Sequence, residues 1–380
     1  MTEELTRREF LRQSVRSAMA AGVCPAVLGG MVGHSAAQAA RGQLSWHEAK
    51  HYKKLDYQRV QCQLCPRQCR VDDVERGYCA TRENKGGRYY TLVYGKPCAV
   101  HVDPIEKKPF FHFLPGTLAF SLSTAGCCME CKFCQNWDIS QVRPEQVENI
   151  DLPPASVVSQ AQRSGARSIA FTYAEPVVFY EYAYDTSVLA RKQGIHPVVV
   201  TSAYILEKPL RELCRQVSAV KVDLKSFSEE YYRTICSAKL QPVLDALRVL
   251  KSEKVWLEIV YLVVPTLNDS PGEIQRMAAW VKKNLGPEVP LHFSRFHPMY
   301  KLKNLPPTPV STLERCRNIA LAQGLHYVYL GNVPGHPGEH TSCPRCKKVL
   351  IRRVGYFIQE NRLRAGRCGF CGHPIPGVWA

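Results

Sequence analysis

Four cysteines lie within eight residues of the segment TAGCCMECKFCQN, residues 124–136. Three of them, Cys127, Cys131 and Cys134, have the spacing C-x3-C-x2-C. An ordinary iron–sulfur cubane takes four thiolates, one per iron, so three thiolates leave one iron open. An open coordination position distinguishes catalytic metal sites from structural ones. The spacing therefore predicts a catalytic cluster, with a three-cysteine zinc site as the alternative. The side chain of Cys128 must diverge from that of Cys127, so we interpret Cys128 as a non-ligand.

Two further groups of cysteines flank this motif. The first has the pattern C-x2-C-x3-C-x9-C and fits either tetrahedral zinc or a second [4Fe–4S] cluster. The second, C-x2-C-x21-C-x2-C, is typical of a zinc ribbon, with two unrelated redox pairs as the alternative. Such close spacing among 17 cysteines favours metal sites over disulfides. The proposed ligands are Cys62, Cys65, Cys69 and Cys79 in the first group and Cys343, Cys346, Cys368 and Cys371 in the second.

The composition is that of an ordinary soluble protein with a sizeable core, because 45% of the 380 residues are hydrophobic and 22% are charged. The formal net charge is +17. An excess of basic residues indicates either a solvated surface or a binding partner with negative charge. That partner would be an acidic electron-donor protein or RNA. Since no basic run has interleaved aromatic residues, nucleic acid is the less favoured partner.

The first 40 residues resemble a twin-arginine (Tat) export signal. Arg7 and Arg8 precede Phe10 and Leu11, a weakly apolar stretch follows over 17–33, and residues 37–39 offer a small-x-small cleavage site. The stretch is too short and interrupted for a transmembrane helix. A chance basic leader is the alternative.

The central motif lies among seven short apolar runs, which we interpret as strands that position it. Between them lie amphipathic helical patterns at 153–165, 207–217 and 272–285. Such strand–helix alternation, repeated six times, predicts a parallel sheet that is closed or partly closed as a barrel, with its chemistry at the carboxyl ends of the strands. The six predicted strands are 119–124, 168–173, 196–202, 219–225, 255–264 and 291–296, and 326–331 is a candidate seventh.

The segments before the barrel are less regular. Residues 44–60 are expected to form a short helix, and 89–95 a strand. The prolines of 103–116 favour a fixed loop over a helix. After the barrel, the β-rich run 349–358 separates the two pairs of the last cysteine group.

The central motif and its position after the first strand resemble the radical S-adenosylmethionine (radical SAM) superfamily. Residues 45–380 resemble the radical SAM enzymes of the AmmeMemoRadiSam system, relatives of pyruvate formate-lyase activating enzymes. The matching segments are QCQLCPRQC (61–69), HVDPIEKKPFFHFLPG (101–116), TAGCCMECKFCQNWDISQ (124–141), TYAEP (172–176), KVDLKSF (221–227) and the final cysteine block.

The resemblance implies a fold and a mechanism. The fold is a partial (β/α)6 TIM-like radical SAM barrel at 117–335, after a leader at 1–40 and a four-cysteine segment at 41–116, and before a zinc ribbon at 336–380. In the mechanism, SAM chelates the open iron of a [4Fe–4S] cluster. Reductive cleavage then yields a 5′-deoxyadenosyl radical, which abstracts hydrogen from the substrate.

The resemblance also implies residues of a SAM pocket. Glu175 occupies the position that holds the methionine amino group in relatives, although it could instead cap the helix that follows Pro176. Thr172 and Tyr173 are candidates for the same wall. Ser202 and Ala203 stand where relatives often have Asn-Gly near the ribose, so a side-chain bond from that position is in doubt.

Further candidates come from the later strands. Asp223 and Lys225 end the fourth strand and form either a cofactor contact or a structural ion pair. Asn268, with Asp269, lies in an adenine-side loop or a simple turn. His292 and Ser294 share one face of the sixth strand, and the sequence does not settle whether that face is interior.

Other functions stay open. One is activation of a glycyl-radical enzyme, weakened because residues 135–167 lack the cysteine-rich insert of classical activases. Another is a zinc-dependent adaptor that binds RNA or protein. For the radical SAM enzyme, the expected partners are an acidic flavodoxin- or ferredoxin-type donor and a protein substrate or AmmeMemo-system protein. SAM supply favours cytoplasmic catalysis, whereas the leader favours export or membrane tethering.

Overall fold

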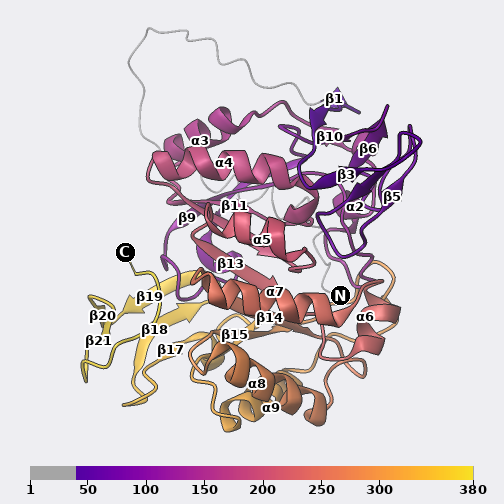
Figure 1. The fold of residues 1–380 in the computed structure, drawn as a ribbon. Helices are drawn as coiled ribbons and strands as arrows, with labels where there is room; N and C mark the ends of the chain where they lie inside the picture. The colour runs from indigo at the N-terminus through magenta and orange to yellow at the C-terminus, as the bar shows by residue number, and fades with distance from the viewer. Residues whose placement is uncertain (1–39, 380) are drawn as a thin grey trace, which may run out of the picture. The chain divides into compact units, whose positions relative to one another are not determined.

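An eight-stranded sheet organises the computed structural model, which describes residues 40–379 (Figure 1). Its order is β16-β15-β14-β13-β12-β11-β9-β8, and every pair is parallel except β8 with β9. The six predicted strands are confirmed and the seventh run joins them, so the fold is α/β. The bounds are β8 Ala99–Pro104, β9 Leu118–Ser123, β11 Ser168–Phe171, β12 His196–Thr201, β13 Ala219–Asp223, β14 Trp256–Val263, β15 Leu291–Arg295 and β16 Val328–Gly331.

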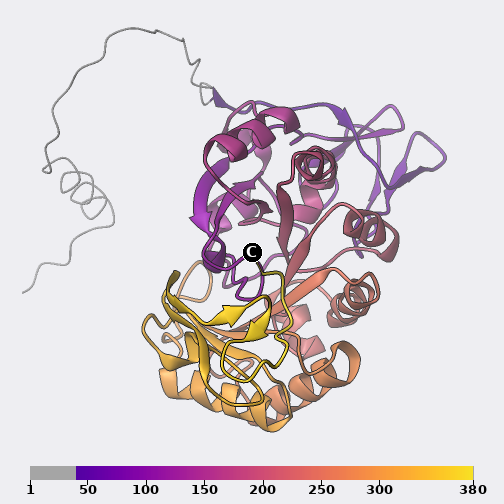
Figure 2. The ribbon, with the colours of Figure 1, turned by 90° about the vertical axis from the view of Figure 1, so that its left-hand side faces the viewer.

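Helices cover the outer face of this sheet, and Figure 2 shows them in an arc around it. Helix α8 shows why these segments form helices. Its N-cap Ser270 accepts a hydrogen bond from the Glu273 N–H at 3.3 Å. Its buried face carries Ile274, Met277 and Val281 at helical spacing. The three predicted helices are α3, α5 and α8. The bounds are α2 Trp137–Ser140, α3 Pro154–Arg163, α4 Tyr180–Lys192, α5 Glu207–Cys214, α6 Glu229–Ile235, α7 Leu240–Ser252, α8 Pro271–Leu285 and α9 Val310–Ala322, with 3-10 turns η1 Ile105–Lys107, η2 Pro144–Gln146, η3 Pro176–Phe179 and η4 Pro337–Glu339.

The segment before β8 consists of short strands, and the helix expected over 44–60 is wrong. Tyr57 and Gln58 both have left-handed φ angles, 58° and 57°, which a right-handed helix excludes. The turn they form lets β3 pair with β4 and so positions Cys62 opposite Tyr52. The strand predicted at 89–95 is present in part, as β7. The bounds are β1 Ala40–Arg41, β2 His47–Glu48, β3 Tyr52–Lys54, β4 Val60–Cys62, β5 Arg70–Val71, β6 Arg82–Lys85, β7 Arg88–Thr91 and, pairing with β1, β10 Glu148–Asn149.

The proline-rich loop after β8 fills the inside of the sheet, as a fixed loop that contains only the short turn η1. Ile105, Phe110, Phe113 and Leu114 form a buried apolar cluster with inward-facing residues of four strands. Next to this cluster, the Glu258 carboxylate accepts bonds from the backbone N–H groups of residues 111 and 112. We call residues 105–114 the floor loop.

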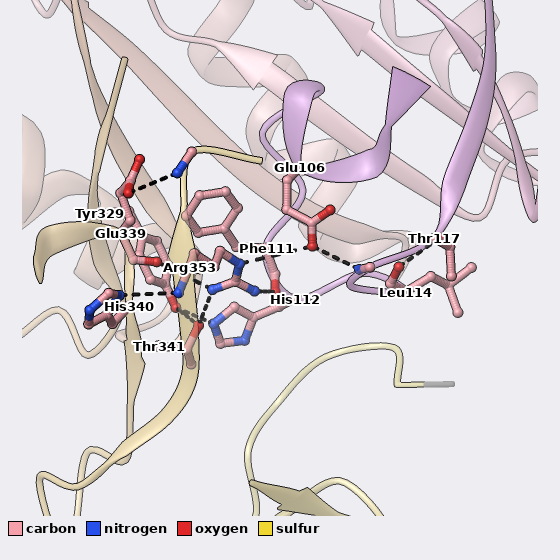
Figure 3. Close-up of polar contacts among 12 residues, drawn as sticks. Glu106, Phe111, His112, Leu114, Thr117, Tyr329, Glu339, His340, Thr341 and Arg353 are labelled. Atoms are coloured by element: carbon pink, nitrogen blue, oxygen red, sulfur yellow. Dashed lines mark hydrogen bonds and ion pairs between the residues drawn. The ribbon is translucent and has the colours of Figure 1, made fainter. Parts of the chain in front are cut away.

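The C-terminal strands pack against the floor loop through Arg353, a fully buried residue (Figure 3). Its guanidinium donates to the Phe111 carbonyl and to Thr341 Oγ1, each at 2.8 Å, and lies 4.0 Å from the Glu106 carboxylate. The C-terminal segment therefore packs over the floor loop. Its strands are β17 Thr341–Ser342, β18 Val349–Val354, β19 Phe357–Asn361, β20 Leu363–Arg364 and β21 Arg367–Cys368.

Among the described residues, no helix has the length and apolar character needed to cross a membrane. The twin arginines and cleavage site of the predicted leader lie outside the described residues.

Candidate active site

The central cysteines lie in the loop that follows the carboxyl end of β9, as predicted. The loop turns at Gly126, whose φ is +92°. A Cβ atom there would lie 2.3 Å from Thr81 Cγ2 and 2.7 Å from the Cys79 carbonyl oxygen. Only glycine fits both this conformation and this contact. The close approach joins the motif loop to the N-terminal four-cysteine segment.

The three motif thiols are partly or fully buried and have polar neighbours. The Met129 N–H donates to Cys127 Sγ at 3.4 Å, and Cys134 Sγ lies 3.2 Å from Ser140 Oγ. Burial raises the pKa of the Cys134 thiol to about 11, whereas a hydrogen bond with Cys236 lowers the pKa of Cys131. Hydrogen bonds to sulfur are one means by which proteins tune cluster potentials. Cys236 was not identified from the sequence, because it is isolated there.

Cys128 is buried between the motif loop and the N-terminal cysteine segment. Its side chain is 1% exposed and forms hydrogen bonds with both Cys127 and Cys65, which raise the pKa of Cys128 itself. Its thiol also lies 3.9 Å from the Tyr204 carbonyl oxygen. These contacts agree with the interpretation of Cys128 as a non-ligand. They also make Cys128 a point of contact between the motif loop and the N-terminal cysteine group, through Cys65.

Glu175 is buried and its carboxylate accepts bonds from three residues. Oε1 accepts from Thr201 Oγ1 and, at 3.2 Å, from the Val177 N–H, while Oε2 accepts from the N–H and hydroxyl of Ser202. The bond from Val177 makes Glu175 the N-cap of η3. The capping alternative is thus present in the structure. It does not exclude a ligand contact, because charge-assisted bonds of a carboxylate can be shared or exchanged.

Tyr173 has a strained backbone and a charged environment. Its φ is +67°, an uncommon value for a bulky residue, and its carbonyl accepts from Asn136 Nδ2 at 2.8 Å. Its hydroxyl donates to Asp103 Oδ2 at 2.6 Å, and Lys108 Nζ binds the same carboxylate atom at 2.6 Å. Thr172 is buried beside it. Asp103 and Lys108 were missed as site residues, although both lie in the segment that resembles the family.

A second charged group lies at the end of β13. Lys225 Nζ donates to Asp223 Oδ2 at 2.9 Å, and Lys221 binds the other oxygen of the same carboxylate. Burial raises the pKa of Asp223, but the two ammonium groups outweigh it and hold the pKa at about 2. The ion-pair alternative is therefore present. The i, i+2 spacing of Lys221 and Asp223 could have identified Lys221 from the sequence.

Ser202 and Ala203 follow β12 directly. The Ser202 side chain is occupied by Glu175, as described above. Ala203 has a φ of +56°, and its N–H donates to Thr201 Oγ1 at 2.9 Å. This left-handed conformation is one that glycine adopts without steric cost.

The last two pocket candidates have structural partners. The Asn268 side chain bonds the backbone of Lys225, Leu262 and Val264, so it fixes the loop after β14. His292 Nε2 lies 2.8 Å from Glu258 Oε2, and its ring packs against Phe111 of the floor loop. His292 thus faces the interior of the barrel, which the sequence left open. Direct contacts of either residue with SAM stay predictions.

The C-terminal cysteines form a metal site. Cys343 Sγ lies 3.6 Å from Cys371 Sγ, Cys346 Sγ lies 3.7 Å from Cys368 Sγ, and all four ligand atoms lie within 4.8 Å of one another. A tetrahedral ion with bonds of about 2.3 Å separates its sulfur ligands by roughly 3.8 Å. The geometry fits one ion bound by four thiolates.

Comparisons with known proteins agree with this site. The family model described as the radical SAM superfamily matches residues 121–278, which include the three motif cysteines. An uncharacterized protein of Methanocaldococcus jannaschii is 45% identical over 330 residues, 86% of this chain and 98% of that protein. The pyruvate formate-lyase-activating enzyme of Clostridium pasteurianum is 25% identical over 160 residues, 41% of this chain and 66% of that enzyme.

Two solved structures are more distant. One is a domain of a pyruvate-formate lyase-activating enzyme from Bacteroides vulgatus, at 20% identity and a TM-score of 0.39, covering 43% of this chain and 98% of that chain. The other is a radical SAM methyltransferase from Sphaerobacter thermophilus, at 18% identity and a TM-score of 0.45, covering 60% and 71%. The cysteine loop lies at the carboxyl end of β9, and the family model spans it. The Methanocaldococcus jannaschii relative matches this chain over nearly its whole length. The chain is an enzyme of the radical SAM superfamily.

Proposed function

We propose that this enzyme binds a [4Fe–4S] cluster through Cys127, Cys131 and Cys134 and uses it to cleave SAM reductively. The observation that carries the proposal is the placement of three thiols from one loop at the carboxyl end of a barrel strand. Within residues 42–379, the motif thiols are not among the groups whose ligand atoms lie within 4.8 Å of one another. The set of three thiolates, one fewer than a structural zinc site uses, supports a cluster with one open iron.

When bound, the cluster and SAM supply a reductive bond cleavage that releases a 5′-deoxyadenosyl radical, and the protein supplies binding and orientation. Cys127, Cys131 and Cys134 would hold three irons and leave the fourth open. The buried Glu175 carboxylate would orient the SAM ammonium. Tyr173, held by Asp103 and Lys108, gives the pocket a rigid wall.

The remaining elements of the proposal follow from charge and chemistry. The charge of +17 suits an acidic one-electron donor of the flavodoxin or ferredoxin type. The four C-terminal thiolates suit structural zinc. Because SAM is supplied in the cytoplasm, we place catalysis there, with the leader retained or acting as a membrane tether.

Similarity to the Clostridium pasteurianum activating enzyme favours a second candidate, activation of a glycyl-radical enzyme. In that case the substrate is a protein backbone glycine, from which a hydrogen atom is abstracted. A small-molecule or AmmeMemo-system substrate leaves that glycine unchanged, so electron paramagnetic resonance of the partner protein separates the two.

The function is tested by anaerobic purification followed by incubation with SAM and dithionite. We expect brown protein with absorption near ~400 nm, the sign of thiolate-bound iron, and formation of 5′-deoxyadenosine and methionine. Colourless protein that contains only zinc and leaves SAM intact would instead support the zinc-dependent adaptor.

Glu175→Gln should weaken SAM binding. Loss of one charge-assisted contact costs about 1.5–3 kcal/mol, or roughly tenfold to a hundredfold in affinity. The amide would also face the Ser202 N–H, so the apo-protein should lose stability as well. Thr201→Val is the matched control, because it removes one donor to Glu175 but keeps the carboxylate. We expect this control to lose stability with little change in affinity, as measured by calorimetric SAM titration and apo melting. Equal losses of affinity in both variants would reduce Glu175 to a structural cap.

A further inference from the structure

The four cysteines of the N-terminal segment surround a cavity. Cys62, Cys65, Cys69 and Cys79 all line it, and Cys128 of the motif loop forms part of its wall. The cavity volume is ≈ 20 Å³, above the roughly 10–15 Å³ that admits a water molecule. These thiols therefore face a shared space rather than one another.

This arrangement differs from that of the C-terminal site in the same protein. There the sulfurs are 3.6 and 3.7 Å apart and leave no room between them for more than one ion. Among residues 42–379, only those four cysteines satisfy the 4.8 Å limit that a single ion requires of its ligands. The N-terminal thiols are too far apart for that limit, so they fit a larger group.

The cavity also carries a buried positive charge with a free donor. Arg82 lines the cavity and is 1% exposed. Its terminal nitrogens bind the buried Glu181 carboxylate, but its Nε has no hydrogen-bond partner among the described residues. Thr81 Oγ1 donates to Cys79 Sγ at 3.3 Å. An unpaired buried donor next to four thiols indicates an acceptor-rich anionic group in the cavity.

We propose that this cavity holds a second iron–sulfur cluster, bound by Cys62, Cys65, Cys69 and Cys79, rather than a zinc ion. One thiolate per iron satisfies a complete cubane, so this cluster has no open iron and binds no substrate. Its sulfides would accept the Arg82 Nε–H. The site is independent of the proposed SAM chemistry, because it shares no ligand with the motif.

Cys128 lies between the two proposed cluster sites. Its thiol contacts Cys65 of the cavity and Cys127 of the motif. Each of these residues is a proposed ligand of a different cluster, so a path of two sulfur–sulfur contacts joins them. We therefore expect the two clusters to interact magnetically when both are reduced.

The experiment uses the full chain with Cys127, Cys131 and Cys134 all replaced by alanine, purified anaerobically. The variant should retain about four irons and absorption near ~400 nm, together with about one zinc at the C-terminal site. Adding Cys62→Ala and Cys69→Ala should remove the iron and leave the zinc. Adding Cys98→Ala instead is the matched control, since this isolated cysteine lies outside all three groups, and it should change neither metal.

About two zinc ions and no iron in the triple variant would overturn the proposal. If the triple variant does not fold, Mössbauer spectroscopy and metal analysis of the wild type decide. About eight irons with one zinc per chain support the second cluster, whereas about four irons with two zincs contradict it. Failure of SAM cleavage alone leaves these counts unaffected, so the two proposals fail separately.

Discussion

Replacing Cys131 with alanine is expected to abolish reductive SAM cleavage. Cys131 is buried and forms a hydrogen bond with Cys236. That bond and the positive charge of Lys225 both lower the pKa of Cys131 and so favour its thiolate. Removing one of three thiolates from a cluster that already lacks a fourth leaves two irons without a protein ligand. The rate of 5′-deoxyadenosine formation should fall to background, and motif-bound iron should be lost. Cys127→Ala and Cys134→Ala should behave in the same way.

Cys128→Ala is the matched control, because Cys128 lies next to the proposed ligand Cys127 and is buried, as Cys131 is. Its sulfur contacts the thiols of Cys127 and Cys65 and the Tyr204 carbonyl, and none of these contacts is a ligand bond. The variant should keep its iron content and its SAM cleavage, with a shifted cluster potential. Loss of iron from Cys128→Ala with retention in Cys131→Ala would reverse our ligand assignment.

Arg353→Met should cause a large loss of stability. The guanidinium is fully buried between the floor loop and the C-terminal strands, and its removal leaves the Phe111 carbonyl without this donor and Glu106 without its counter-charge. Breaking a buried charge pair in this way costs about 3–5 kcal/mol. A urea titration of the metal-loaded protein measures the change in the free energy of unfolding.

The neighbouring Arg352→Met supplies the comparison. Arg352 is exposed on the same strand, so its substitution should change the free energy of unfolding by no more than about 0.5 kcal/mol. Similar losses in both variants would show that the strand, and not the buried guanidinium, determines how tightly the segment packs.

The strands and helices of the barrel were predictable because each is marked by a pattern within its own short segment of the sequence. Each strand is a short apolar run, and the amphipathic patterns between the runs became α3, α5 and α8. The N-terminal segment was not predictable in the same way, since its short strands pair through left-handed residues such as Tyr57 that no periodicity marks.

The site was predictable only as far as spacing could indicate it. The ligand motifs follow from intervals between cysteines, whereas the contacts that tune them join distant residues. Cys131 meets Cys236, Cys128 meets Cys65, and Tyr173 meets Asp103, 70 residues away. Such pairs depend on the folded topology, so a single sequence cannot identify them. For the same reason the partner of His292, Glu258 on the adjacent strand, became evident only in the structure.

The contact between Arg353 and Phe111 has a consequence for the timing of synthesis. The two residues are 242 positions apart in the chain. Synthesis adds about 5–20 residues per second, so the strand that carries Arg353 is made on the order of 10–50 seconds after the floor loop. During that interval the apolar floor and Glu106 are open to solvent, to chaperones and to the factors that deliver iron and sulfide. A chain that ends after Cys134 but before Arg353 therefore carries every motif cysteine and lacks the strands that cover the floor loop, so we expect it to be degraded more readily than the full chain.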